Sequence, residues 1–338
     1  MKGTGALAAF ALCLLASQAV AQSATKLRFS LDWKFEGQNA FVHMAKAKGY
    51  YEHEGLDVTV DAGNGSSAAI QRIATGTYDV AIGDLSTLIE FAANNPGPAR
   101  MQAVYVLYDE LPMAYFALKK SGVRSIADLR GKSVVSPSFA ASTRLWPLFA
   151  KAAGIEPSSV TFMAADPQLL ATIVIRGDAV AMGGFRNVLL DFTSRGVAPA
   201  DVVVMPVADV GVRPYGNALL ASSKLIAEQP KALAGFVRAT NRALREALAD
   251  PAGAVKYLKQ REPLADEALE VQRFTLLIPA IATDRVRANG LGNAERAVLE
   301  KQVAEVGEAY KLKTTPAAET LYNAGFLPPK AERMLIAQ

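Results

Sequence analysis

The chain has 338 residues, of which 51% are hydrophobic, and a formal net charge of +4 at pH 7. This length exceeds the size at which a single hydrophobic core usually divides into two domains. The basic residues are scattered rather than gathered in a patch or stripe, which argues against nucleic-acid binding. There are two histidines, His43 and His53, and one cysteine, so little material is present for a histidine-built metal site or a Ser-His-Asp triad.

The first 21 residues have the pattern of a secretory signal peptide. Lys2 precedes a short apolar run over residues 6–15, and a small-x-small sequence follows at residues 19–21. The run is too short to span a bilayer, and no later segment reaches the roughly 18 apolar residues of a membrane helix. We expect cleavage after Ala21 and a mature protein outside the cytoplasm; a buried N-terminal helix is the alternative. Cys13 lies in this segment after a residue too large for a lipoprotein signal, so the mature chain should have neither a lipid anchor nor a thiol.

Strands and helices alternate in the first part of the chain. Alternating apolar and polar residues predict strands over residues 26–31, 55–60, 78–83 and 102–107. Helical spacing predicts helices over residues 38–53, from the polar turn 63–67 through Ile73, and over 86–94. This order is typical of βαβ units and a largely parallel sheet.

A second alternating series begins after Pro112, and its first segment, residues 114–118, has the pattern of an extended crossover. The sequence then predicts helices over residues 125–129, 143–153, 167–175 and 187–194, and strands over 133–135, 160–163, 179–182 and 202–205. Residues 217–221 are extended again, and beyond Ser222 the chain is almost wholly helical. Four prolines lie near expected helix starts: Pro230, Pro251, Pro263 and Pro316.

This order predicts an α/β protein of two lobes joined by two crossovers. We expect the crossovers near residues 112–118 and 213–221. The predicted lobe boundaries place residues 22–113 and 218–338 in the first lobe and 114–217 in the second. Each lobe is expected to contain a mostly parallel sheet flanked by helices.

Six short motifs carry a resemblance to a known family. They are Leu31-Asp32-Trp33, Lys48-Gly49-Tyr50-Tyr51, Glu54-Gly55-Leu56-Asp57-Val58, Gly63-Asn64-Gly65-Ser66, Gly76-Thr77-Tyr78-Asp79-Val80 and Asp128-Leu129-Arg130-Gly131-Lys132. Over nearly all of residues 26–330 the chain resembles solute-binding proteins of ABC importers, in the branch that looks like thiamine-pyrimidine-precursor binders and includes sulfonate and nitrate receptors. The resemblance implies a two-lobed type II periplasmic-binding fold that closes on one small molecule.

The resemblance also implies the setting in which the protein works. We expect a monomeric periplasmic receptor whose partners are a small-molecule ligand and an ABC permease in the inner membrane. We expect no catalytic activity, no cofactor, no metal and no nucleic acid.

Four polar or glycine-bearing loops, residues 32–39, 63–67, 83–87 and 136–143, follow predicted strands. In open α/β sheets ligands bind at the carboxyl ends of strands, against helix N-termini that offer free amide donors. From these loops and from turns of the second lobe we expect the ligand contacts Asp32, Trp33, Phe35, Asn39, Gly65, Ser66, Ser67, Asp84, Ser138, Ser142, Phe185, Arg186 and Tyr215.

Several of these residues have a structural alternative in the first lobe. Trp33 and Phe35 either stack on the ligand or pack in the core, and the polar loop around Trp33 favours stacking. The turn 65–67 either holds an acceptor group of the ligand or caps a helix. Asp84 either accepts from ligand amino groups or caps the helix that follows it.

Similar alternatives hold in the second lobe. The two glycines before Phe185 permit close backbone approach, and Phe185 could stack on a flat ligand. Arg186 either clamps an anionic group or pairs with an acidic residue across the cleft. Residues 215–217 either touch the ligand or fix the return crossover.

The candidate residues leave two ligand classes open. The aromatic candidates favour a flat heteroaromatic molecule such as a thiamine-precursor-like pyrimidine, and Asp32 and Asp84 suit its amino groups. Arg144 and Arg186 would instead suit an organic anion such as a sulfonate or carboxylate. We favour the heteroaromatic ligand.

Three other protein classes share the two-lobed plan. The resemblance extends to pyrimidine-synthase enzymes that use a histidine and a cysteine-rich motif, but the expected mature chain has no cysteine to match it. An effector domain of a transcription regulator would have a helix-turn-helix, and none precedes the first predicted strand. A tethered sensor would need a transmembrane segment, which the sequence does not predict.

Overall fold

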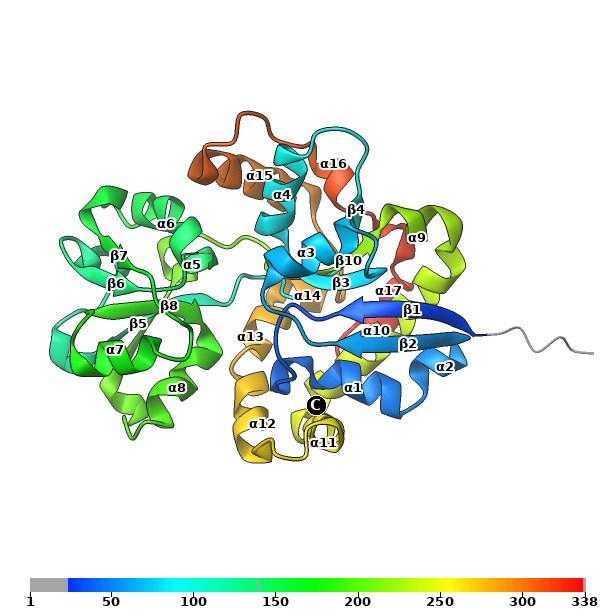
Figure 1. Cartoon of the computed structure of the whole chain (residues 1–338), viewed down its shortest axis with the longest axis horizontal. Helices are drawn as coiled ribbons and strands as arrows, with labels where there is room; N and C mark the ends of the chain where they lie inside the picture. The colour runs from blue at the N-terminus through cyan, green and yellow to red at the C-terminus, as the bar shows by residue number, and fades with distance from the viewer. Residues whose placement is uncertain (1–23, 139, 337–338) are drawn as a thin grey trace, which may run out of the picture.

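The computed structural model describes residues 24–138 and 140–336. The predicted signal peptide and its cleavage site lie outside these residues. The described chain forms two lobes, each built on a five-stranded sheet flanked by helices (Figure 1). None of the described helices is both long and apolar enough to cross a membrane.

The first sheet has the strand order β2-β1-β3-β10-β4. Its strands are β1 (Thr25–Ser30), β2 (Leu56–Asp61), β3 (Val80–Asp84), β4 (Met101–Val106) and β10 (Asn217–Ser222). Strand β1 is parallel to β2 and β3, whereas β10 is antiparallel to β3 and β4. Four of the five strands therefore point the same way, in agreement with the predicted mostly parallel sheet.

The second sheet repeats this plan with the order β7-β6-β8-β5-β9. Its strands are β5 (Met113–Leu118), β6 (Ser133–Val135), β7 (Thr161–Met163), β8 (Ala181–Phe185) and β9 (Val202–Pro206). Strand β6 is parallel to β7 and β8, and β5 is antiparallel to β8 and β9. In each sheet the strand in fourth position, β10 in the first and β5 in the second, is antiparallel to the other four.

The expectation for residues 114–118 was wrong. They do not form a crossover but belong to β5, which lies between β8 and β9 inside the second sheet. Every residue of β5 is buried, because helices cover both faces of the sheet, and a strand in that environment is a continuous apolar run with no alternation to identify it. The chain instead passes between the lobes through residues 107–112 and 211–216, so the second crossover ends before β10 and does not extend to residue 221 as expected.

Helices cover both faces of the first sheet. They are α1 (Ala40–Ala47), α2 (Tyr50–His53), α3 (Ser66–Ala74), α4 (Leu85–Asn94), α9 (Ser223–Glu228), α10 (Pro230–Ala249), α11 (Pro251–Arg261), α12 (Glu267–Thr275), α13 (Ile278–Ile281), α14 (Asp284–Asn289), α15 (Arg296–Tyr310), α16 (Ala318–Leu321) and α17 (Lys330–Arg333). The single helix predicted over residues 38–53 is divided, because Gly49 adopts a left-handed conformation with φ 71°. As predicted, Pro230 and Pro251 begin α10 and α11, where the missing amide proton of proline is no loss.

The core of the first lobe has two parts, one on each face of the sheet. Helices α1, α10 and α11 pack on one face, and α3, α4 and α15 on the other (Figure 1). On the first face Phe236 of α10 meets the ring of Phe29 of β1 edge-on, with centroids 5.1 Å apart, and stacks on Tyr51 at 5.3 Å. This aromatic cluster anchors α10, the longest of the described helices, against the strands that carry the cleft.

The second lobe has shorter helices. They are α5 (Ala141–Arg144), α6 (Trp146–Ala152), α7 (Leu170–Arg176) and α8 (Leu189–Thr193). The helix predicted over residues 143–153 therefore starts two residues earlier and is interrupted at Leu145.

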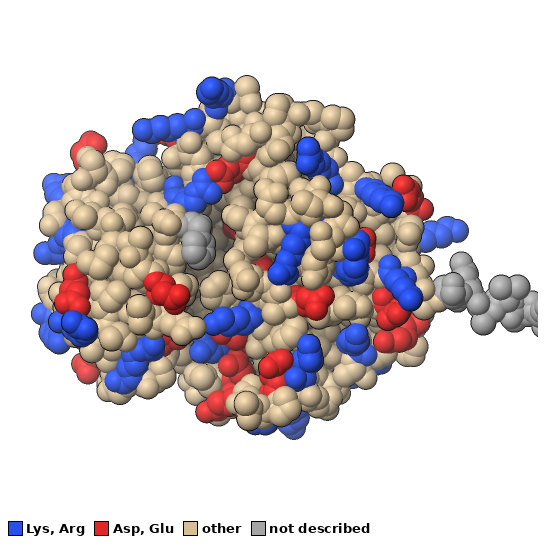
Figure 2. Space-filling model, viewed as in Figure 1, with Lys and Arg blue, Asp and Glu red and all other residues tan. Residues whose placement is uncertain are grey.

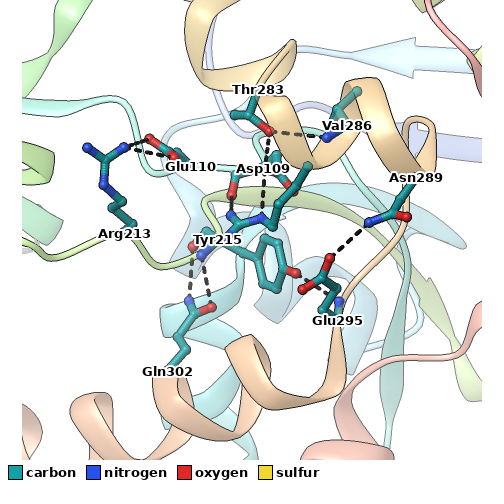
Figure 3. Close-up of polar contacts among 10 residues, drawn as sticks. Asp109, Glu110, Arg213, Tyr215, Thr283, Val286, Asn289, Glu295 and Gln302 are labelled. Carbon is teal, nitrogen blue, oxygen red and sulfur yellow. Dashed lines mark hydrogen bonds and ion pairs between the residues drawn. The ribbon is translucent and has the colours of Figure 1, made fainter.

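Polar side chains hold the two crossovers together (Figure 3). Arg213 of the second crossover donates to both carboxylate oxygens of Glu110 in the first, at 3.0 and 2.9 Å. The neighbouring Asp109 is 4% exposed and accepts from the Thr283 hydroxyl at 2.5 Å and from Nε of Arg285 at 3.0 Å. The first crossover is thus tied both to the second and to the start of α14.

The second crossover is held by Tyr215. Gln302 of α15 accepts from the Tyr215 amide at 3.1 Å and donates to its carbonyl at 2.9 Å. The Tyr215 hydroxyl accepts from the Glu295 amide at 2.8 Å (Figure 3). With its ring fully buried, Tyr215 anchors the crossover to the first lobe.

Candidate functional site: an interlobe cleft

A cleft of about 640 Å³ lies between the lobes, and loops of both lobes line it. This volume is within the range of small-molecule sites in proteins, roughly 300–1,000 Å³. Figure 2 shows the groove between the two halves of the molecule. From the first lobe and the first crossover the lining includes Asp32, Trp33, Gln38, Ser66, Asp84, Tyr108, Asn217 and Arg273; from the second lobe it includes Ser142, Gly184, Phe185, Asp191 and Arg195.

Two interlaced loops form the first-lobe side. The amides of Gly63 and Gly65 donate to the carbonyls of Trp33 and Asp32, at 2.9 and 2.6 Å. A Cβ at Gly63 would lie 2.0 Å from the Leu31 carbonyl oxygen, so only glycine allows this close approach. The interlaced backbone fixes Asp32 and Trp33 at the edge of the sheet where β1 ends.

Asp84 ends β3 and forms the floor of the cleft. Its Oδ1 accepts from the Thr87 amide at 3.0 Å and so caps α4, while its own amide donates to the Ser66 hydroxyl at 3.0 Å. Its Oδ2 is buried and has no hydrogen-bond partner. Burial raises the pKa of Asp84 to about 6.

Asn217 lies beside Asp84 because β10 pairs with β3 in a register that places the two residues opposite each other. Its Nδ2 donates to Oδ2 of Asp32 at 2.6 Å, and its Oδ1 is buried without a partner. Burial raises the pKa of Asp32 to about 6, although the bond from Asn217 opposes the shift. The floor therefore holds two carboxyl groups and two unpartnered acceptor atoms.

A charged cluster connects the lobes at the cleft. Arg273 of α12 lies 3.3 Å from Glu270, 3.8 Å from Glu36 and 3.9 Å from Asp191, and Asp191 belongs to α8 of the second lobe. Burial raises the pKa of Asp191 and of Glu270, and the charge of Arg273 opposes both shifts. Because three carboxylates surround Arg273, its charge is already balanced by the protein.

Small residues shape the second-lobe side. A Cβ at Gly183 would lie 2.4 Å from Cβ of Ser142, so this glycine lets β8 approach α5. The hydroxyls of Ser142 and Ser136 are 2.6 Å apart and share a hydrogen bond. Phe185 lies edge-on to Tyr108 of the first crossover, with ring centroids 6.1 Å apart, so two aromatic rings meet at the cleft.

The sequence comparisons agree with this geometry. The sequence model of the family described as NMT1/THI5 like matches residues 37–254, more than half of the chain. The chain belongs to this family. It is 31% identical to the riboflavin-binding protein RibY of Chloroflexus aurantiacus over 260 residues, which cover 75% of this chain and 72% of RibY. It is 26% identical to a 4-amino-5-hydroxymethyl-2-methylpyrimidine phosphate synthase of Aspergillus parasiticus, with 72% of each chain covered.

Solved structures of periplasmic-binding proteins share the fold of this NMT1/THI5-like chain. The aliphatic sulphonate binding protein SsuA from Escherichia coli matches with a TM-score of 0.70 and 13% identity, over 90% of this chain and 94% of SsuA. The alkanesulfonate-binding SsuA from Xanthomonas axonopodis pv. citri matches with a TM-score of 0.66 and 18% identity, over 88% and 99%. The predicted fold and the predicted family resemblance are confirmed.

Eight of the thirteen predicted contact residues line the cleft of the NMT1/THI5-like protein. They are Asp32, Trp33, Gly65, Ser66, Ser67, Asp84, Ser142 and Phe185. Their contact with a ligand stays a prediction. For Asp84 both alternatives hold at once, since one oxygen caps α4 while the other is unpartnered.

The other five predicted residues do not line the cleft. Phe35 packs edge-on against His43, with ring centroids 4.8 Å apart, and the side-chain amide of Asn39 donates to the Lys34 carbonyl at 3.3 Å. Tyr215 is fully buried in the crossover, Ser138 is exposed, and Arg186 is half-buried, with its amide bound to the first crossover. Their positions give no support to a role in ligand binding.

Arg144, the other candidate for binding an anion, is also outside the cleft lining. It forms an ion pair with Glu90 of α4 through two hydrogen bonds, and its guanidinium lies 4.4 Å from the ring centre of Tyr310. Since Arg144 is in the second lobe and its partners are in the first, its charge links the lobes. Neither Arg144 nor Arg186, on which the organic-anion hypothesis was based, is in the cleft lining.

Proposed function

We propose that this protein is a periplasmic solute-binding receptor that captures one flat heteroaromatic molecule between its lobes and delivers it to an ABC permease. The observation that carries the proposal is the interlobe cleft, with buried acceptors on its floor and aromatic rings on its walls. RibY is named as a riboflavin-binding protein and SsuA as a sulphonate-binding protein, which supports capture of a small molecule as the shared activity. The cleft is wide enough for a ligand of more than one ring.

The pyrimidine-synthase relatives keep an enzyme as the second candidate. The chain has one cysteine, Cys13, which lies outside the described residues. Of its two histidines neither lines the cleft, and burial with the nearby charges of Arg261 and Lys46 lowers the pKa of His43 to about 4. A histidine that is neutral at pH 7 and outside the cleft is a poor general acid, so we favour the receptor.

A ligand that binds the closed, folded state should stabilise it by mass action. At a free concentration 100 times its Kd, the ligand adds about 2.7 kcal/mol to the free energy of unfolding. A thermal-shift screen of riboflavin, aminopyrimidines and alkanesulfonates should therefore raise the unfolding midpoint by several degrees with at least one heteroaromatic compound. Mass spectrometry of the mixture should recover that compound unchanged; a time-dependent product would favour the enzyme.

Trp33 offers a test of whether an aromatic ring of the cleft stacks on the ligand. It is half-buried in the cleft, and the loss of its stacking, about 0.5–1.5 kcal/mol, should reduce affinity up to about tenfold in Trp33→Ala. Ligand addition should change the tryptophan emission of the wild type and not that of the variant.

The matched control is Trp146→Phe. Trp146 is buried in the second lobe, where its indole N–H donates to the Pro157 carbonyl at 2.9 Å, outside the cleft lining. This variant should keep both the affinity and the ligand-dependent emission change. If Trp33→Ala unfolds the protein instead of weakening binding, Trp33 belongs to the core.

A further inference from the structure

Three ion pairs join the two lobes in the part of the chain that the structure describes. They are Arg144–Glu90, Lys151–Glu308 and Arg273–Asp191. The side chains of Lys151 and Glu308 are 69% and 65% exposed, and ion pairs so exposed contribute little to stability. Arg273 and Asp191 are 3.9 Å apart, too far for a hydrogen bond. The pair formed by Arg144 therefore differs in kind from the other two.

Arg144 of α5 has partners on two helices of the first lobe. Its two terminal nitrogens donate to different carboxylate oxygens of Glu90 on α4. Its guanidinium carbon is 4.4 Å from the ring centre of Tyr310, the last residue of α15. The side chains of Arg144 and Glu90 are 30% and 19% exposed, so water screens their attraction only in part. Bidentate arginine–carboxylate pairs and shielded cation–π contacts are the stronger members of their classes.

The helices that carry these side chains are held within their own lobes. In the second lobe the carbonyl of Ser142, two residues before Arg144, accepts from the Tyr115 hydroxyl of β5 at 2.5 Å. In the first lobe Gln302 of α15 donates to the Ser86 hydroxyl of α4 at 3.1 Å, which joins the two helices to each other. A change in the angle between the lobes therefore changes the contact of α5 with α4 and α15.

The contact lies beside the cleft and away from the crossovers. Gln302 binds the second crossover at Tyr215, and Tyr310 is two turns further along α15, about 12 Å at 1.5 Å per residue. Thr87 of α4 and Ser142 of α5 line the cleft. Rotation of the lobes about the crossovers would move α5 away from α4 and open the cleft between these two residues.

We propose that Arg144, Glu90 and Tyr310 form an interlobe clamp that must break before the lobes separate, so that Arg144 sets how long a ligand stays bound without touching it. A ligand held between closed lobes leaves after they open, and its affinity depends on the fraction of molecules in the closed state. Arg144 is thus a positioning residue. Its effect on ligand retention rests on the proposed function, whereas its effect on the lobes does not.

The first measurement uses the ligand-free protein. The chain without its predicted signal peptide has no cysteine, so Leu169→Cys and Leu264→Cys introduce the two sites for spin labels. Leu169 belongs to the second lobe and Leu264 to the first; they are 53% and 101% exposed, and neither lines the cleft. Double electron–electron resonance then gives the distribution of distances between the lobes.

We expect Arg144→Ala to raise the ratio of long to short distances about tenfold. Arg144→Glu and Glu90→Arg should each have a similar effect, because like charges then face each other. The double exchange Arg144→Glu/Glu90→Arg should recover at least part of the short distances, since the charges are opposite again. The matched control is Arg176→Ala: Arg176 is 70% exposed and pairs with Asp178 of its own lobe, so the distribution should not change.

The second measurement is stopped-flow tryptophan fluorescence with riboflavin and with 4-amino-5-hydroxymethyl-2-methylpyrimidine. In Arg144→Ala the dissociation rate constant of the compound that binds should rise about tenfold, and the association rate constant should not fall. Slower association would mean that Arg144 shapes the binding site itself and would contradict the clamp. Arg176→Ala should leave both rate constants unchanged.

The outcomes separate the clamp from the proposed function. An unchanged distance distribution in Arg144→Ala, or no recovery in the double exchange, would overturn the clamp and leave the receptor intact. If neither compound binds, the receptor for these compounds is contradicted, and the distances in the ligand-free protein still decide on the clamp. If Arg144→Ala does not fold, Glu90→Gln, which keeps the shape of the side chain and removes its charge, gives the same test.

Discussion

Replacing Asp84 by Asn should stabilise the ligand-free protein at pH 7.5 by about 2 kcal/mol. Burial raises the pKa of Asp84 to about 6, so its ionised form is penalised in the folded state, and a shift of one pKa unit corresponds to about 1.4 kcal/mol. Asparagine is also a good N-cap residue, so α4 keeps its cap. The new amide can in addition donate to the free oxygen of Asn217.

The pH dependence has a definite sign. Because the folded pKa of Asp84 is raised above its usual 3.8, the folded state binds this proton more tightly than the unfolded state does. The stability that protonated Asp84 contributes is present below about pH 4 and is lost as the pH rises towards 6. The advantage of Asp84→Asn over the wild type should therefore be small at pH 4 and large above pH 6.

Asp109→Asn is the matched control in urea unfolding. Asp109 is buried and its pKa is also raised, but its Oδ2 accepts hydrogen bonds from Thr283 and Arg285. Because these partners oppose the shift, the same substitution should stabilise the protein less at Asp109 than at Asp84. A lower unfolding midpoint for Asp84→Asn at pH 7.5 would contradict the claim that the cleft floor keeps an unsatisfied carboxylate for a ligand.

Replacing Arg285 by Ala should destabilise the protein by about 3 kcal/mol. The substitution leaves the Asp109 carboxylate buried at the first crossover without its cation, and breaking a buried ion pair from one side typically costs about 3–5 kcal/mol. The variant also loses a bond to the Asp109 carbonyl at 2.6 Å and the contact of the guanidinium with the Tyr215 ring.

The double variant Arg285→Ala/Asp109→Asn identifies the cause. If the uncompensated charge dominates, neutralising Asp109 should recover more than 1 kcal/mol of the loss in chemical unfolding at pH 7.5. If the double variant loses as much unfolding free energy as the two single variants together, the guanidinium acts through packing rather than through its charge.

The fold was largely predictable because its signals are local. Alternating patterns, glycine turns and the prolines at α10 and α11 mark the elements within a few residues of where they form. Strand β5 was missed because strands buried on both faces lose the alternation that identifies them. Because β5 is an inner strand buried on both faces, its sequence has no alternation of apolar and polar residues.

The cleft was predictable only in part. Asp84 and Trp33 follow strands whose carboxyl ends meet at one edge, and that rule locates them without coordinates. The pairing of Asn217 with Asp84 depends on β10 returning to the first sheet from far along the chain. No local pattern predicts that register.

The cations were the least predictable feature. Arg144 and Arg186 have the right chemistry for binding an anion, but the charge of Arg144 is balanced by Glu90 on a helix of the other lobe. Whether an arginine is free for a ligand depends on its tertiary neighbours. Arg273 and Asp191 were missed as cleft residues for the same reason, because they lie on helices from distant parts of the chain.

The most direct test of the proposed receptor is native mass spectrometry of residues 22–338, the chain without its predicted signal peptide, mixed with the heteroaromatic compound that gives the largest thermal shift. We predict one ligand per chain, released unchanged on denaturation, and loss of the complex in Asp84→Asn. Absence of any one-to-one complex, or release of a chemically altered compound, would contradict the account.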